Sequence, residues 1–374
     1  MQFQIKEESG VSNRGNQFRL KKVINRAAAG EKLTIAFLGG SITQGSLASR
    51  IDLCYASRVS NWWRETYPQG DFTFINGGIG GTTSHFGTAR VAEDVLSHRP
   101  DLVFVEFSVN DDPTPFFQET YEGLLRKILL FDTSPAVVLI HNVRYDTGGN
   151  AQTIHAALGR YYGLPGVSMQ NTIFPAVVSG NLPVRDITED DLHPNDLGHE
   201  LVAGVVTSFL ESVDRDRETK EPSYAVPEKP MTQNRYENCT RYNNKNLSVS
   251  VSDFVRDEEP QQGITDIFKN GFYSAKQDAL LKCRVAGSEL AIQYRKSVRH
   301  PAPLAELVID DDREHKILLD GNFDEDWGDC LFLQPVLIHG ESKTHTLEIR
   351  IVAAEDEQIP FYLNAVIAAD AAGR

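Results

Sequence analysis

The sequence predicts an α/β sandwich with a parallel sheet, followed by an all-β domain. Between residues 31 and 212, short apolar runs alternate with helix-length segments, the pattern of strands connected by helices. After a charged, proline-containing segment at residues 214–235, the chain changes to short strand-like runs between Gly, Asp, Asn and Pro clusters. The length of 374 residues suits two domains, because one domain usually takes about 100–200 residues.

Four continuous apolar runs in the first half predict strands that are covered on both faces. These runs are residues 33–38, 72–75, 102–107 and 136–141. Helices are expected between them at residues 55–67, 88–96, 120–131 and 150–162, and an amphipathic helix at residues 197–213 closes this half. We therefore assign residues 1–213 to one α/β domain.

The second half predicts an antiparallel sandwich or jelly roll. Few windows are long enough for a helix, and short runs recur at residues 247–251, 290–294, 307–309, 345–351 and 361–367. Residues 214–235 have high charge, three prolines and hardly any apolar periodicity, as expected for a linker. Residues 236–374 are therefore assigned to the β domain.

The net charge limits the classes of partner that the protein can bind, and the absence of targeting patterns indicates its location. The chain carries 52 acidic against 37 basic side chains, a net charge of −15, which disfavours nucleic acid or an anionic membrane as a partner. Residues 1–10 lack the basic and apolar regions of a secretory signal, and no apolar stretch approaches the roughly 18 residues of a spanning helix. We expect a cytoplasmic location.

The cysteines agree with that location. Cys54, Cys239, Cys283 and Cys330 lie far apart in the sequence and form no metal-binding pattern. Buried free thiols in a reducing compartment are the expected state. A Cys239–Cys283 or Cys283–Cys330 disulfide is the alternative.

A serine follows the first predicted strand. Residues 37–45 (FLGGSITQG) place Ser41 after two glycines and before a segment that can begin a helix. Ligands collect at the carboxyl ends of strands in an open α/β sheet, and glycines allow a tight turn there. Ser41 is therefore a candidate nucleophile. The alternative is that Ser41 only caps the following helix.

Two further segments at strand ends can donate hydrogen bonds to an oxyanion. Residues 76–83 (NGGIGGTT) hold four glycines in five positions, which exposes backbone amides; a phosphate loop is the alternative, although its GK[ST] ending is absent. Asn110 follows the strand at residues 102–107. Its side-chain amide can face a developing negative charge, or it can cap the next turn.

A fourth segment pairs an acid with a histidine. Asp190 precedes His193 by three residues, so its carboxylate can accept the Nδ1–H of the imidazole and hold the base in the correct tautomer. One competing interpretation is a capping loop, in which Asn195 or Asp196 opens the next helix. Another is a metal site. Its candidate ligands are Asp190, Asp191, His193 and His199.

In this order, the four segments resemble the SGNH (GDSL-like) hydrolase superfamily. The first block of that superfamily carries the nucleophile, here Ser41 in GGSITQG. The second block, N-x-x-x-x-G, matches Asn76 to Gly81. The resemblance covers roughly the first 210 residues, which makes chance agreement improbable.

The third and fifth blocks of the superfamily are also present, and the sequence departs from the usual block patterns at two positions. The third block, usually G-x-N-D, reads SVND here, so Asn110 is kept while Ser108 replaces the leading glycine. The fifth block, D-x-x-H, matches Asp190 and His193. The aspartate that precedes the nucleophile in the GDS form is missing, because the first block reads GGSIT.

The resemblance implies a three-layer α/β/α sandwich and a serine hydrolase that requires no cofactor and no metal. Ser41 would attack an ester, His193 would take its proton, and Asp190 would orient the imidazole. The backbone N–H groups of Ser41 and Gly81, with the side chain of Asn110, would form the oxyanion hole.

The GGSIT and SVND variants followed by a β-rich domain are similar to bacterial carbohydrate esterases whose second domain is a carbohydrate-binding module. This implies an acetyl esterase that acts on oligosaccharides from hemicelluloses, either mannan or xylan. Within residues 320–329 (DGNFDEDWGD), Trp327 and Asn322 can offer a sugar an apolar face and hydrogen bonds. We expect this loop to lean over the Ser41 cleft, and His85 to line that cleft; the alternative is that Trp327 packs under the sandwich.

Two other functions stay open at this point. A lipase or thioesterase would keep the same fold and nucleophile but would need a broad apolar acyl pocket. A non-catalytic sugar-binding protein would not need an intact set of Ser41, Asp190 and His193. The sugar, the hydroxyl position and the formation of a homo-oligomer are not fixed by the sequence.

Overall fold

The computed structural model describes Ile5, residues 10–220 and residues 222–371. The chain divides into two compact units, Met1–Asn234 (unit 1) and Arg235–Arg374 (unit 2). Most of residues 1–10, where no secretory signal is expected, lie outside the described residues. Within the part of the chain that is described, no helix has both the length and the apolar character needed to cross a bilayer.

Unit 1 is built around a six-stranded sheet with the strand order β1-β6-β5-β4-β2-β3. The strands are β1 (Val11–Asn13), β2 (Lys32–Gly39), β3 (Asp71–Gly78), β4 (Leu102–Glu106), β5 (Ala136–His141) and β6 (Gly166–Ser168). Strands β2 to β6 pair in parallel, and only the edge strand β1 runs antiparallel to its neighbour. The predicted parallel sheet is confirmed, with the addition of this one reversed edge.

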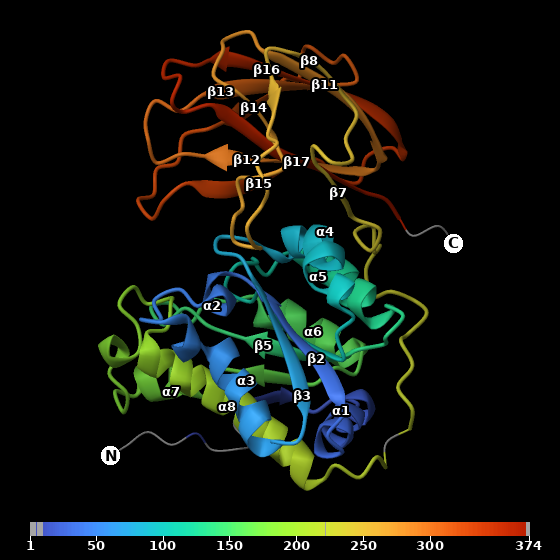
Figure 1. The fold of residues 1–374 in the computed structure, drawn as a ribbon, viewed down its shortest axis with the longest axis vertical. Helices are drawn as coiled ribbons and strands as arrows, with labels where there is room; N and C mark the ends of the chain where they lie inside the picture. Colours follow the sequence, from blue (N-terminus) through green and yellow to red (C-terminus); the bar gives the residue numbers. More distant parts are fainter. Residues whose placement is uncertain (1–4, 6–9, 221, 372–374) are drawn as a thin grey trace. The chain divides into compact units, whose positions relative to one another are not determined.

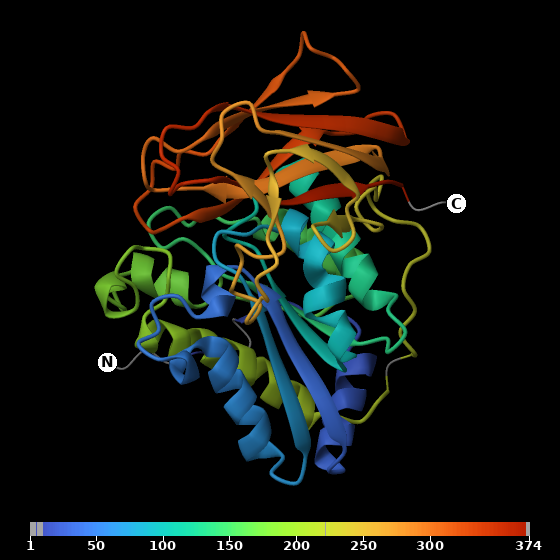
Figure 2. The same cartoon turned by 45° about the horizontal axis from the view of Figure 1, so that its top comes forward.

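Helices cover both faces of this sheet. They are α1 (Phe18–Ala28), α2 (Ser41–Gln44), α3 (Tyr55–Thr66), α4 (Ser84–Asp94), α5 (Pro115–Leu129), α6 (Gln152–Tyr161), α7 (Ile173–Val178) and α8 (Asp196–Arg215). One apolar core contains residues of α1, α3, α7 and α8, and a second core contains residues of α4, α5 and α6. Helices α3 and α8 lie side by side on the first face (Figure 2).

Strand β2 shows why both faces need a cover. Its residues Ile35 and Phe37 belong to the first core, whereas Ala36 and Leu38 belong to the second. Successive side chains of a strand point to opposite faces, so an apolar run of this kind is stable only between two layers. The predicted three-layer α/β/α sandwich is therefore confirmed.

Some elements differ from those the sequence predicts. Helix α5 begins at Pro115 rather than at residue 120, because Pro115 occupies the first turn and the Thr114 hydroxyl caps the Phe117 N–H. Helix α1 was not predicted, although its buried positions Leu20, Val23, Ile24 and Ala27 have helical spacing.

The segment predicted as a linker is fastened to unit 1. The Asn25 side chain donates to the Arg217 carbonyl, and the Tyr224 hydroxyl donates to the Tyr162 carbonyl. Further along, the Glu122 carboxylate accepts the backbone N–H groups of residues 231 and 232. Residues 216–220 and 222–234 therefore lie along the rest of unit 1 instead of forming a free connection. Hydrogen bonds of this kind leave no apolar periodicity in the sequence.

Unit 2 is an antiparallel β sandwich, as predicted. One sheet has the order β15-β12-β17-β10-β9, with β7 also paired to β17, and the other has the order β14-β13-β16-β11-β8; Figure 1 shows them as stacked layers. The strands are β7 (Thr240–Tyr242), β8 (Val249–Ser252), β9 (Val255–Arg256), β10 (Phe272–Ser274), β11 (Leu280–Gly287), β12 (Glu289–Lys296), β13 (Leu304–Ile309), β14 (Ile317–Asp320), β15 (Cys330–Leu337), β16 (Lys343–Ala353) and β17 (Phe361–Ala369). Residues of both sheets share one apolar core.

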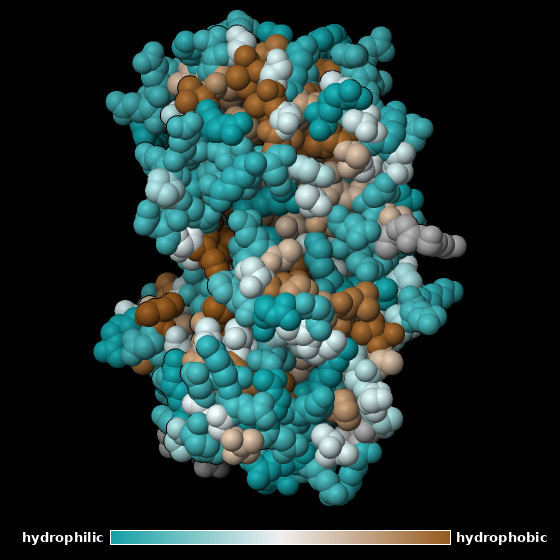
Figure 3. Space-filling view, turned by 45° about the vertical axis from the view of Figure 1, so that its right-hand side comes forward, coloured by the Kyte–Doolittle hydropathy of each residue, from teal (hydrophilic) through white to brown (hydrophobic). Residues whose placement is uncertain are grey.

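The surface and the cysteines follow the sequence predictions. Hydrophilic residues cover most of the face of each unit that Figure 3 shows, with small apolar patches between them. All four cysteines are buried free thiols, and neither of the alternative disulfides forms. The cytoplasmic location that these thiols suggested stays a prediction.

Candidate active site

Ser41 lies at the carboxyl end of strand β2, as expected for a nucleophile in this kind of sheet. It is the first residue of helix α2, and the residue in the N-cap position is Gly40. Ser41 therefore does not cap the helix, and that alternative is wrong. Its side chain is 8% exposed, so the hydroxyl is held in a largely desolvated position.

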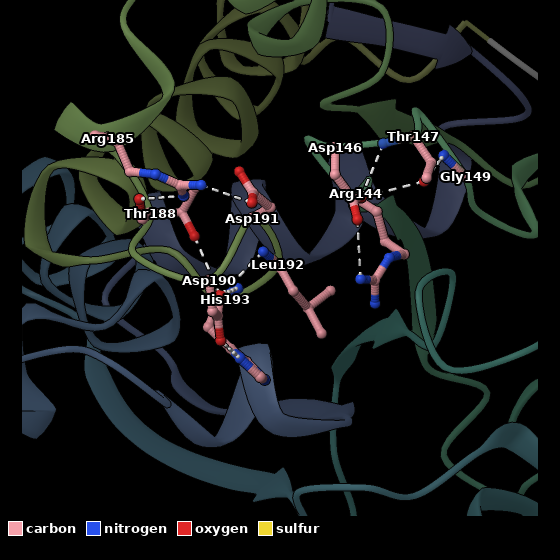
Figure 4. Close-up of polar contacts among 10 residues, drawn as sticks. All are labelled: Arg144, Asp146, Thr147, Gly149, Arg185, Thr188, Asp190, Asp191, Leu192 and His193. Atoms are coloured by element: carbon pink, nitrogen blue, oxygen red, sulfur yellow. Dashed lines mark hydrogen bonds and ion pairs between the residues drawn. The ribbon is translucent and has the colours of Figure 1, made fainter.

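A hydrogen-bonded chain joins the three residues predicted as the catalytic set. The Ser41 Oγ lies 2.8 Å from Nε2 of His193, and Nδ1 of the same imidazole lies 2.6 Å from an Asp190 carboxylate oxygen. In this arrangement the carboxylate fixes the Nδ1–H tautomer, so Nε2 is free to accept the serine proton. Figure 4 shows the Asp190–His193 contact within its loop.

The environment of Asp190 keeps this carboxylate ionised. Partial burial alone would raise its pKa, but hydrogen bonds from the His193 side chain and from the backbone N–H groups of His193 and Leu192 outweigh burial and lower the pKa to about 2. The two backbone bonds measure 2.7 Å and 3.0 Å. Asp190 is therefore ionised at neutral pH and can stabilise a protonated imidazole there.

The loop that carries Asp190 and His193 is held by residues that the sequence did not single out. The Arg185 guanidinium donates to the backbone carbonyls of Thr188 and Glu189 and lies 2.7 Å from the Asp191 carboxylate (Figure 4). Tyr145 donates its backbone N–H to the Asp191 carbonyl at 2.7 Å. No short motif marks Arg185, because its role depends on the folded loop.

The capping and metal interpretations of this segment have different outcomes. Asn195 is the N-cap of α8, and its side chain accepts the N–H groups of Leu197 and Gly198, so the capping interpretation is confirmed; it does not exclude the contact between Asp190 and His193. The His199 ring nitrogens lie 3.1 Å from the Ser46 carbonyl and 3.3 Å from the Tyr55 nitrogen. No group of three metal-ligating side chains is found in the described residues.

The sheet brings the oxyanion segments next to Ser41. Gly39 of β2 pairs with Gly78 of β3 on one side and with Glu106 of β4 on the other. The glycine loop after β3 and the turn that carries Asn110 after β4 therefore flank the serine. This convergence follows from the parallel strand register.

Most amides of the glycine loop already have partners. The N–H of Gly78 donates to its neighbour Asn76, that of Ile79 to the Gly39 carbonyl, and that of Gly80 to the Gln44 side chain. Gly81 adopts the left-handed conformation, φ +67°, and no hydrogen bond within the described residues uses its N–H. The N–H of Gly81 is thus available to an oxyanion.

The missing aspartate of the first block has a structural reason. A Cβ atom at Gly40 would collide with the side-chain oxygen of Asn110, so any larger residue would displace that amide. That oxygen is buried and has no hydrogen-bond partner. Ser108, the other departure, donates its hydroxyl to the Asn142 carbonyl at 3.0 Å and so anchors the turn before Asn110.

A buried carboxyl group lies below the nucleophile. Glu106 at the end of β4 is fully buried, and the Thr43 hydroxyl lies 3.3 Å from it and 2.8 Å from the Tyr55 hydroxyl. Burial raises the pKa of Glu106 to about 7. The sequence did carry a signal for it, since Glu106 is the one charged residue in the apolar run at residues 102–107.

The residues predicted to bind sugar have separate outcomes. Trp327 is 53% exposed and packs its ring edge-on against Phe323, so the interpretation that it lies under the sandwich is wrong. The Asn322 side chain is engaged in its own turn, with Asp320 and the Ala302 N–H. His85 is buried against Phe116, and burial lowers its pKa to about 3, which keeps it neutral. Roles in substrate binding stay predictions for all three.

A three-layer α/β sandwich that presents a Ser–His–Asp chain at the carboxyl ends of its strands defines a serine hydrolase of the SGNH type. Residues 37–201 match the model of the GDSL-like lipase/acylhydrolase family. The chain belongs to this family, as the sequence motifs predicted.

Relatives extend the likeness beyond unit 1. A solved two-domain esterase active on acetylated mannans is 52% identical, with a TM-score of 0.97 over 99% of this chain and 100% of that chain. The same type of esterase, co-crystallised with mannopentaose, gives a TM-score of 0.95 at 52% identity over 100% of both chains. An acetylxylan esterase from Geobacillus stearothermophilus is 26% identical over 208 residues, which are 48% of this chain and 93% of that protein.

Proposed function

We propose that this protein is a serine esterase that removes O-acetyl groups from acetylated mannan oligosaccharides. The hydrogen-bonded chain from Ser41 through His193 to Asp190 carries the proposal, because it supplies a nucleophile, a base and an orienting carboxylate in one place. Mannan is favoured over xylan because the relative active on acetylated mannans is 52% identical over both units. The acetylxylan esterase matches over about half of the chain, at 26% identity.

In the first step, a tetrahedral intermediate forms on Ser41. Nε2 of His193 takes the hydroxyl proton while Ser41 Oγ attacks the acetyl carbonyl, and Asp190 stabilises the resulting imidazolium. The negative charge moves to the former carbonyl oxygen. The N–H groups of Ser41 and Gly81 and the side-chain amide of Asn110 are the donors proposed to receive it.

When this intermediate collapses, the bond to the sugar oxygen breaks and an acetyl ester is left on Ser41; in the second step, water removes the acetyl group. The imidazolium of His193 gives its proton to the departing sugar hydroxyl, then accepts a proton from the water that attacks the Ser41 acetyl ester. Collapse of the second tetrahedral intermediate releases acetate and restores the Ser41 hydroxyl. Every proton moves between these groups and the substrate, so the scheme requires no cofactor.

Unit 2 is proposed to contribute to sugar binding. Trp327 offers an exposed aromatic face, which is the surface that sugars use for stacking in proteins. We expect Trp327→Ala to raise KM for oligosaccharides more than KM for p-nitrophenyl acetate; equal effects on both substrates would remove Trp327 from substrate binding. We also propose that unit 2 acts as a carbohydrate-binding module and that the protein acts in the cytoplasm.

The test is acetate release from acetylated mannan and acetylated xylan oligosaccharides. Wild type is compared with Ser41→Ala and with Ser179→Ala, a serine whose hydroxyl donates to the Ala176 carbonyl and accepts from the Asn181 side chain. We expect faster release from mannan, loss of release in Ser41→Ala, and wild-type rates in Ser179→Ala. Release that survives in Ser41→Ala would contradict the proposal.

Acyl length distinguishes an acetyl esterase from a lipase or thioesterase. A pocket built for acetyl groups loses activity steeply on p-nitrophenyl esters as the acyl chain grows, whereas a lipase gains it from the added apolar contact. Hydrolysis that rises from the acetate to the octanoate would favour the lipase.

A further inference from the structure

A buried carboxylate and a buried imidazole lie directly behind the oxyanion segments. The Asp111 carboxylate is 3.0 Å from Nε2 of His155, and both side chains are fully buried. Asp111 follows Asn110 in the chain, while His155 belongs to α6 on the same face of the sheet as α4 and α5. Neither residue belongs to the Ser–His–Asp chain at the mouth of the site.

The same carboxylate also holds the glycine loop. Its second oxygen accepts the backbone N–H of Ser84 at 2.8 Å, and Ser84 is the first residue of α4, three positions after Gly81. Asp111 thus ties the end of the glycine loop to the turn that carries Asn110. A carboxylate at the first turn of a helix is also stabilised by the helix dipole.

His155 is fixed by its surroundings so that one donor faces Asp111. Its ring stacks on Tyr121, with 3.6 Å between ring centroids and 10° between planes. Its Nδ1 is buried and has no partner, so the proton of the neutral ring belongs on Nε2, facing the carboxylate. A buried pair of this kind adds little net stability over apolar residues. Net stability therefore does not explain the pair, and its contacts to the two loops are the alternative explanation.

We propose that Asp111 and His155 are positioning residues that set the distance between the Gly81 N–H and the Asn110 amide. This inference rests on the proposed esterase function, in which these groups receive the oxyanion. The donors come from different loops, and Asp111 is bonded to both loops while His155 locks its orientation. Displacing a donor by about 1 Å can cost up to about 100-fold in rate without a change in substrate contacts.

The test uses His155→Phe, which keeps a ring against Tyr121 and removes only the donor. His141→Phe is the matched control: His141 is equally buried, its ring centroid lies 6.3 Å from that of His155, and both its nitrogens lack hydrogen-bond partners. On p-nitrophenyl acetate we expect kcat of His155→Phe to fall about 10-fold to 100-fold, with KM within about two-fold of wild type. His155→Gln, whose amide can donate to Asp111, should recover part of the loss, and His141→Phe should resemble wild type.

A double-mutant cycle with Asn110→Ala separates positioning from general damage. If His155 acts through the oxyanion donors, His155→Phe should lower kcat much less in the Asn110→Ala background than in wild type. Equal effects in both backgrounds, a loss expressed in KM, or wild-type kcat in His155→Phe would overturn the inference. Asp111→Asn, which keeps the oxygen for Ser84, carries the same test if His155→Phe does not fold. Absence of ester hydrolysis in wild type would instead refute the proposed function.

Discussion

Two carboxyl groups of the site have environments that shift their pKa values in opposite directions. Glu106, at the end of a central strand, is fully buried, and its pKa is raised to about 7. The Asp190 side chain, in the loop before α8, is 45% exposed, and hydrogen bonds lower its pKa to about 2. One side of the site is thus formed by buried strand ends, and the other by a half-exposed loop that carries the base His193.

The two sides are held in place by different means. On the buried side, sheet register and apolar packing fix the positions of Ser41, Gly81 and Asn110. On the loop side, local hydrogen bonds and the Arg185 contacts do the same work. Substitutions should therefore cost most where they remove charge from the loop, and least where they remove an exposed support.

The largest effect is expected on the loop side, from Asp190→Asn. An amide in place of the carboxylate presents N–H to Nδ1, which favours the wrong tautomer of His193 and removes the charge that stabilises the imidazolium. We expect kcat to fall by about 10³-fold to 10⁴-fold. Asp191→Asn, in the neighbouring carboxylate, is the control. A fall below about ten-fold in Asp190→Asn would mean that the loop side does not control the base.

The next effect is expected on the buried side, from Gly40→Ala. The new methyl group would collide with the Asn110 oxygen and push that amide away from the serine. Removing an oxyanion donor costs about 10²-fold to 10³-fold in kcat, and we expect a loss in this range. Gly263→Ala is the control, because a Cβ atom there meets nothing within 4 Å. Wild-type kcat in Gly40→Ala would show that Asn110 takes no part in the reaction.

Glu106→Gln tests whether burial raises the pKa of Glu106, and the free energy of unfolding is the quantity measured. Because the pKa of Glu106 rises from 4.5 to about 7 on folding, the folded state holds more protons between these values, and wild type loses stability as pH rises through that window. Gln does not titrate, so the stability of the variant relative to wild type should rise by about 3 kcal/mol across the window and then level off. Urea denaturation over a pH series measures this difference. Parallel stability curves for the two proteins would contradict it.

The smallest effect is expected from Arg185→Ala. This residue supports the loop through an ion pair with Asp191, in which the arginine side chain is 59% exposed, and such pairs are worth about 1 kcal/mol or less. We expect kcat to fall by about three-fold to five-fold, because the backbone N–H of Tyr145 still holds the loop. Arg99→Ala is the control, since it removes an arginine of similar exposure, 63%, from an ion pair with Asp132 elsewhere in unit 1. A loss above about 100-fold would show that the loop depends on Arg185 alone.

The sequence predicted the parts of the site that short spacing encodes. Ser41 follows a glycine pair at a strand end, and Asp190 precedes His193 by three residues, so local chemistry suffices to propose them. Asp111 and His155 lie 44 positions apart and meet only after α6 has packed on the sheet. No pattern in a single sequence marks such a contact.

The fold shows the same limit. Strands β2, β4 and β5 were predicted as buried because apolar runs between two helix layers have no polar alternation. The same prediction was wrong for residues 72–75, because β3 lies at the edge of the sheet and its residues there are exposed or half-buried. Strand β15 was not predicted, because Pro335 interrupts its apolar run. The structure explains why a proline is tolerated there: β15 is the edge strand of its sheet, so one side of it needs no backbone hydrogen bond from the N–H that proline lacks. The short strands β1 and β6 carry three residues each and leave almost no pattern to detect.

The most direct measurement is covalent labelling with a small fluorophosphonate, followed by mass spectrometry of the digested protein. We expect one adduct, on the peptide that contains Ser41, and a labelling rate that falls in His193→Ala and Asp190→Asn together with ester hydrolysis. An adduct on another serine, or labelling at the wild-type rate in His193→Ala, would contradict the assignment of Ser41 as a nucleophile activated by this imidazole.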